Sequence, residues 1–105
     1  MEIIYDNVKI FFDAICLHIK DHNDQVVSYD DPKKILIGYK CLNTNSIFYI
    51  RLSSLNKDLH RDNILRTFIS NKNKRNLIVN ILNISSSYDN FLLNLNKYNM
   101  LVCCW

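Results

Sequence analysis

The sequence contains almost no glycine, proline or alanine: Gly38, Pro32 and Ala14 are the single examples of each in 105 residues. With one glycine, the chain cannot form the glycine-rich loops that hold nucleotide phosphates. Asparagine and isoleucine are abundant instead, with 15 and 14 residues. Because the scarce residues have GC-rich codons and the abundant ones have AT-rich codons, the composition indicates an AT-rich genome, such as that of a phage, a large DNA virus, a low-GC bacterium or certain protists.

Long apolar runs and paired-cysteine motifs are missing as well. No apolar stretch approaches the roughly 20 residues that span a bilayer, and the amino terminus has no basic stretch followed by a cleavage site. The cysteines at 16, 41, 103 and 104 have neither CxxC nor zinc-ligand spacing, so we interpret them as thiols of a reducing compartment. The sequence therefore predicts a soluble, cytoplasmic protein, inside the host cell if it is viral, with no cofactor, no metal and no membrane partner.

The stretch 34–52 gives the clearest structural signal. Two runs rich in β-branched and aromatic residues, KILIGYKC and IFYIRL, flank a cluster of Asn, Thr and Ser that suits a turn. Both faces of the second run are largely apolar, as in a strand that is covered on two sides. The pattern predicts a β-hairpin in the middle of a sheet.

The remaining chain predicts one α+β (or α/β) domain over residues 1–105, with three helices around a mixed sheet of four to five strands. Apolar content of 49% and charged content of 22% are typical of a globular protein. The alternation of strands and helices after the hairpin predicts some parallel pairing. The expected segments are a short strand or lead-in at 2–5, a helix at 7–22 capped by Asp6, an edge strand at 25–29, a helix at 54–70 with a break or second cap near Asp62, a basic loop at 71–76, a buried strand at 77–84, a helix at 87–98 and a terminal strand at 100–105.

Candidate catalytic residues do not assemble into a recognisable site. His18 and His22 have a helical spacing that can place two imidazoles on one metal, but no further ligand cluster accompanies them. The serines at 53–54 and 85–87 stand where helices are expected to begin, so capping explains them. We interpret the trio at 60–62 as the exposed side of a helix, and we predict that the protein is not an enzyme.

Charge is segregated along the chain. Residues 1–31 hold seven acidic and two basic side chains, whereas residues 33–75 hold ten basic and two acidic ones. A basic surface can bind phosphates or an acidic protein face, while the simpler alternative is that the two segments neutralise each other. The candidate partner-binding cations are Lys40, Arg51, Lys72, Lys74 and Arg75.

The helix at 7–22 carries a second apolar strip, which includes Ile10 and Leu17 and lies nearly opposite the main one. A helix that is apolar on two sides is buried on two sides, by its own domain or by a partner. Our first hypothesis is therefore a small protein-binding module, a virus- or phage-encoded accessory factor that antagonises a host or defence protein, with homodimerisation through this helix as another outcome. The alternative is a nucleic-acid-binding module that uses residues 33–75.

Overall fold

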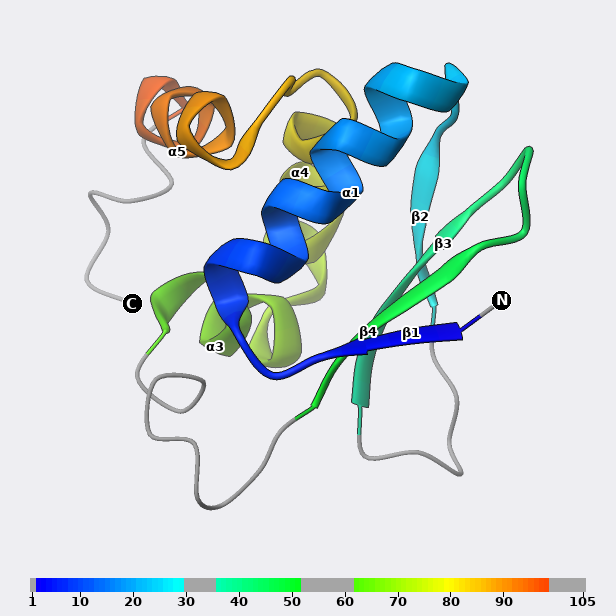
Figure 1. Cartoon of the computed structure of the whole chain (residues 1–105). Helices are drawn as coiled ribbons and strands as arrows, with labels where there is room; N and C mark the ends of the chain where they lie inside the picture. The colour runs from blue at the N-terminus through cyan, green and yellow to red at the C-terminus, as the bar shows by residue number, and fades with distance from the viewer. Residues whose placement is uncertain (1, 30–35, 52–61, 99–105) are drawn as a thin grey trace.

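The computed structural model describes residues 2–29, 36–51 and 62–98. They form an α+β fold in which a mixed four-stranded sheet is covered by helices (Figure 1), as the sequence predicts. Within this described part, no helix is both long and apolar enough to cross a membrane. The elements are β1 (Glu2–Tyr5), α1 (Val8–His22), β2 (Val26–Tyr29), β3 (Leu36–Cys41), β4 (Ile47–Arg51), α3 (Asn63–Ser70), α4 (Lys72–Asn83) and α5 (Tyr88–Lys97).

The predicted hairpin is formed by β3 and β4 and occupies the centre of the sheet, whose strand order is β1-β4-β3-β2. β3 pairs antiparallel with both β4 and β2, and the predicted edge strand is β2. The parallel pair consists of β1 and β4, with Ile3 opposite Phe48. The amino-terminal segment is thus a strand. It lies beside β4, although α1, β2 and β3 come between the two in the sequence.

The predicted loop at 71–76 and the predicted strand at 77–84 are wrong, because residues 72–83 form α4 and Asn71 and Ile84 are its caps. A short apolar run such as LIVNILNI fits a buried strand and a buried helix equally well. Burial along this segment follows the periodicity of a helix. The buried residues are Ile78, Val79, Ile81 and Leu82, whereas Leu77 is exposed. Asn71 starts this helix by accepting a hydrogen bond from the backbone N–H of Lys74 at 3.1 Å.

Of the helix N-caps predicted within the described residues, two are confirmed and one is wrong. α1 is capped by Asn7, which accepts from the N–H of Ile10 at 3.0 Å, and not by the preceding Asp6. The second cap expected at Asp62 is confirmed, since its carboxylate accepts from the N–H of Leu65 at 2.9 Å. Ser87 caps α5 as predicted. The expected caps at 53–54, the expected helical residues 54–61 and the expected strand at 100–105 lie outside the described residues.

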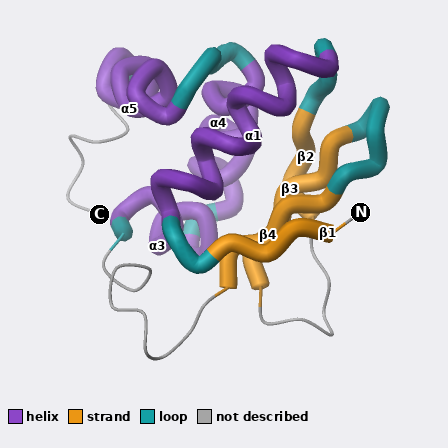
Figure 2. The backbone as a smooth tube through the Cα atoms, in the orientation of Figure 1, coloured by secondary structure: helices purple, strands orange, loops and turns teal. Residues whose placement is uncertain are grey.

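The helices lie on one side of the sheet (Figure 2). The hydrophobic core is formed by buried residues of both layers. Phe11, Phe12 and Ile15 of α1 are fully buried there, against inward-facing residues of the hairpin such as Tyr39. The opposite side of the sheet, which we call the outer face, carries the alternate residues of each strand. Cys16 and Cys41 are buried, and burial raises the pKa of each thiol to about 12. Both therefore act as small apolar side chains.

Candidate functional site

The second apolar side of α1 is open to solvent. Ile10 is 55% exposed and Leu17 is 44% exposed, while Ala14 between them is half-buried. These three residues, at i, i+4 and i+7, form one continuous row that we call the α1 strip. Its helix is held rigidly, because the opposite stripe of α1 is embedded in the core.

A groove of about 520 Å³ runs beside the α1 strip, between the carboxyl-terminal half of α1, strand β1 and the β3–β4 turn. Leu17 and Ala14 belong to both features, so the strip and the groove are continuous. Ile3, Tyr5 and Phe48 contribute apolar surface to it. The other lining residues are His18, Asp21, His22, Thr44 and Ser46.

A buried carboxylate fixes one end of this groove. Asp24 is 4% exposed, and its Oδ1 accepts hydrogen bonds from the backbone N–H groups of Gln25 at 2.7 Å and Asn43 at 2.8 Å. Its Oδ2 accepts from the hydroxyl of Thr44 at 2.9 Å and from the N–H of Thr44 at 3.3 Å. These bonds connect the end of α1 to the β3–β4 turn, 20 residues away.

The same hydrogen bonds fix the proton positions around His18. Burial tends to raise the pKa of Asp24, but the bonds from Asn43, Gln25 and Thr44 outweigh it, and the pKa is lowered. An ionised carboxylate accepts only, so the hydroxyl of Thr44 donates to Asp24. His18 Nε2, 3.0 Å from the Thr44 hydroxyl oxygen, must then carry a proton and donate to it. The His18 ring is held in place by this contact and lies 4.4 Å from the His22 ring, centroid to centroid.

One cluster has the residue types of a metal site. The ligand atoms of His18, Asp24 and Cys41 lie within 4.8 Å of one another, and these are ligand types that zinc accepts. However, four hydrogen bonds already use the lone pairs of Asp24. Burial and the charge of Asp24 keep Cys41 a protonated thiol, with a pKa of about 12. The geometry favours a structural hydrogen-bond cluster that positions the turn.

The candidate cations do not gather on one surface. Lys40 and Arg51 alternate with the inward-facing residues of their strands and therefore lie on the outer face of the sheet. Lys72, Lys74 and Arg75 lie in the first turn of α4, in the helical layer (Figure 1). One basic segment of the sequence is thus divided between two sides of the molecule.

Arg75 and Arg51 are engaged in contacts within the protein. The Nε of Arg75 donates to the backbone carbonyl of Phe68 at 2.7 Å, and its guanidinium lies 5.2 Å from the centre of the Phe68 ring. Arg51 and Asp6 are both exposed and form an ion pair at 3.8 Å. Arg75 therefore joins α3 to α4, a role that its sequence context did not indicate.

Comparison of the chain with protein-family models, curated proteins and solved structures finds no match. The interpretation of the site therefore comes from its own residues. The Asp24 cluster was missed from the sequence because an Asp after a helix is also an ordinary turn residue, and nothing local connects it to Thr44.

Proposed function

We propose that this protein is a small, non-enzymatic binding module that docks the α1 strip onto a partner protein. The observation that carries the proposal is the exposure of Ile10 and Leu17 on the outer side of a helix whose inner side is fully buried. A rigid helix that presents aliphatic side chains at i and i+7 matches a common mode of protein recognition. Little conformational entropy is lost on docking, because the core already holds the helix.

The proposed biological role is that of an accessory factor, encoded by a virus or phage, that antagonises a host or defence protein inside the cell. Support comes from the AT-rich composition and from the polar clusters, whose hydrogen bonds hold the fold together. Such a factor acts by covering a surface of its target. The net charge of +3 would favour a target with an acidic surface.

The nucleic-acid alternative receives less support from the geometry. Phosphate binding uses several cations on one face, so that they follow the backbone of the nucleic acid. Here the candidates are divided between the outer face and α4, and Arg75 is engaged with Phe68. We therefore propose a protein partner.

The test is the double substitution Ile10→Glu with Leu17→Glu, compared with Lys9→Glu. The single change at the exposed Lys9 of α1 alters the net charge by the same two units but removes no aliphatic side chain. Tagged proteins would be used to capture partners from the source cells or their host, with quantitative mass spectrometry. We expect the double variant to lose the captured partner by about ten-fold or more, since each aliphatic side chain contributes roughly 1 kcal/mol when buried.

Circular dichroism and light scattering complete this test. The double variant should keep its helical signal, because both residues lie off the core. Global unfolding would show that the strip is part of the core, and undiminished capture by a folded variant would contradict the proposal. If the wild type is a dimer and the double variant is a monomer by light scattering, the partner is a second copy of the chain.

A further inference from the structure

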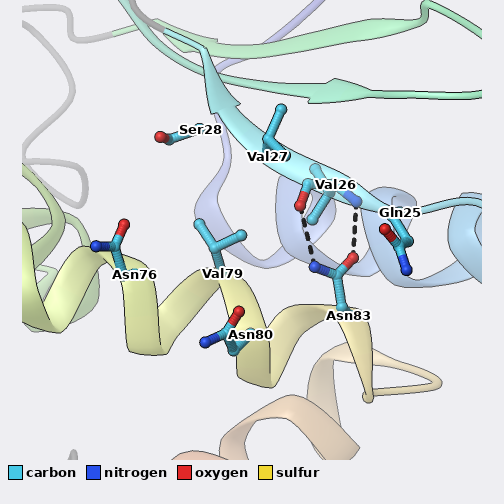
Figure 3. Close-up of a pocket in the computed structure, with 8 residues that line it drawn as sticks. All are labelled: Gln25, Val26, Val27, Ser28, Asn76, Val79, Asn80 and Asn83. Carbon is cyan, nitrogen blue, oxygen red and sulfur yellow. Dashed lines mark hydrogen bonds between the residues drawn. The ribbon is translucent and has the colours of Figure 1, made fainter.

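The side chain of Asn83 closes part of the open edge of β2 (Figure 3). The N–H of Val26 donates to Oδ1 of Asn83 at 2.7 Å, and Nδ2 of Asn83 donates to the carbonyl of Val26 at 3.0 Å. These backbone groups point away from β3, because the neighbouring bond runs from the N–H of Leu42 to the carbonyl of Gln25 and the pairs alternate. A carboxamide donates and accepts as a peptide group does, so Asn83 stands where a further strand would pass.

Ser28 is the next residue whose backbone groups point toward this edge. It is opposite Tyr39 in the register, two residues beyond Val26, so its N–H and carbonyl have the same orientation. No described residue forms a hydrogen bond with these two groups. An unpaired edge of this kind is a template for another extended chain.

Two more carboxamides follow the same edge. Asn80 and Asn76 come one and two turns before Asn83 on α4, and both are exposed. Ser28 lies about 6.6 Å along the strand from Val26, and a helix covers that distance in four to five residues. The open groups of Ser28 are therefore level with the interval between Asn80 and Asn76, as Figure 3 illustrates.

The groove between β2 and α4 has a volume of about 450 Å³ and, among the described residues, an uncharged lining. An anion or a cation would find no opposite charge there, whereas amide and backbone groups match the alternating donors and acceptors of a polypeptide. Val27, which is 37% exposed, supplies apolar contact for side chains. The lining residues are Gln25, Val26, Val27, Ser28, Asn76, Val79, Asn80 and Asn83.

We propose that this groove binds an extended peptide segment of a partner protein, which adds to β2 as a short outer strand. Its backbone would pair with the N–H and carbonyl of Ser28 on one side and with Asn76 and Asn80 on the other. This site is separate from the α1 strip and goes beyond the binding proposed for it. A second copy of the chain fits poorly, because it would bring its own α4 to the same groove. A single extended segment avoids that collision.

The probe is a phage-displayed library of random octapeptides, selected against the whole protein. Selected peptides would be titrated by fluorescence anisotropy against Ser28→Pro and against Asn76→Ala with Asn80→Ala. Proline at 28 removes the outward N–H without breaking a sheet bond, so the strand should persist. We expect each variant to weaken binding about ten-fold or more. Asn96→Ala, which removes an exposed carboxamide on α5, and the Ile10→Glu/Leu17→Glu variant should bind like the wild type.

Backbone methylation of a selected peptide supplies the decisive control. Because alternate residues of a strand point their N–H groups to opposite sides, N-methyl groups that face β2 should abolish binding, whereas N-methyl groups that face α4 should weaken it only about as much as the Asn76→Ala/Asn80→Ala variant does. The absence of selected peptides, an N-methyl scan without alternation, or equal affinity for all variants would overturn the proposal. If Ser28→Pro fails to fold, the Asn76→Ala/Asn80→Ala variant and the N-methyl scan still test the proposal. Self-association lost in Ser28→Pro would overturn it in favour of a second copy.

Discussion

The ring of Tyr49 covers Gly38, its direct partner in the antiparallel register of β3 and β4. A Cβ atom at position 38 would lie 2.7 Å from Cε1 and 2.8 Å from Cδ1 of that ring. Tyr49 is fully buried on the outer face, and its ring meets that of Tyr29 at 5.9 Å. The one glycine of the sequence thus occurs where a tyrosine ring lies against the backbone, which explains its position without any special backbone conformation.

Gly38→Ala should destabilise the protein by about 1–3 kcal/mol, because the new methyl group must displace a buried ring. Urea denaturation of the variant measures this difference. In a Tyr49→Ala background the ring is gone, and Ala is a better strand residue than Gly, so the same change should be neutral or stabilising. A cost that is equal in both backgrounds would show that the ring contact is not the cause.

Acid should weaken the connection between α1 and the β3–β4 turn. The pKa of Asp24 is lower in the folded protein than its ordinary value near 3.8, so its stabilising effect is fully present above that value. The effect is lost as the pH falls through the folded-state pKa. Asp24→Asn should cost about 2–3 kcal/mol at pH 7, since an amide oxygen cannot replace an ionised acceptor of four bonds.

The difference in unfolding free energy between the wild type and Asp24→Asn should shrink as the pH falls below about 4. Asp21→Asn, an exposed change on the last turn of α1, should leave stability within about 0.5 kcal/mol of the wild type. Urea denaturation at pH 7 and pH 3 gives both comparisons. A difference that is the same at both pH values would contradict the assigned role of the carboxylate.

The sequence predicts a secondary-structure element correctly where its local pattern has one interpretation. The apolar stripe of α1 fits only a helix, and the two alternating runs around the Asn–Thr–Asn–Ser cluster fit a hairpin. The pattern was insufficient for α4, because eight mostly apolar residues suit a strand or a helix. Its helical state depends on Asn71 as a cap and on the core that buries Ile78 and Leu82.

The sites depend on contacts that no local pattern encodes. Helical periodicity places Ile10 and Leu17 on a second strip, but the sequence left open whether the domain itself or a partner covers that strip. The structure shows both residues exposed, so the domain does not cover them. The pairing of Asn83 with Val26 joins residues 57 apart, and the abundance of asparagine hides any signal from one of them. The candidate cations of the basic segment do not form one surface, because the alternation of side chains along β3 and β4 places Lys40 and Arg51 on the outer face, away from α4.

The last prediction separates Arg75 from its basic neighbour Lys72. Arg75 donates to the carbonyl of Phe68 and stacks on its ring, so Arg75→Ala should destabilise the protein by about 1–2 kcal/mol. Lys72 is exposed at the amino-terminal end of α4, where the helix dipole disfavours a cation. Lys72→Ala should therefore change stability by less than about 0.5 kcal/mol in either direction.

Thermal and urea denaturation of the two variants, with Arg75→Lys as a third, would measure these effects. Lysine keeps the charge but cannot reproduce the planar stacking, so Arg75→Lys should recover only part of the loss. Equal stability of the Arg75→Ala and Lys72→Ala variants would mean that the contact with Phe68 contributes nothing to the α3–α4 junction. The assignment of Arg75 to a stabilising contact between α3 and α4 would then be wrong.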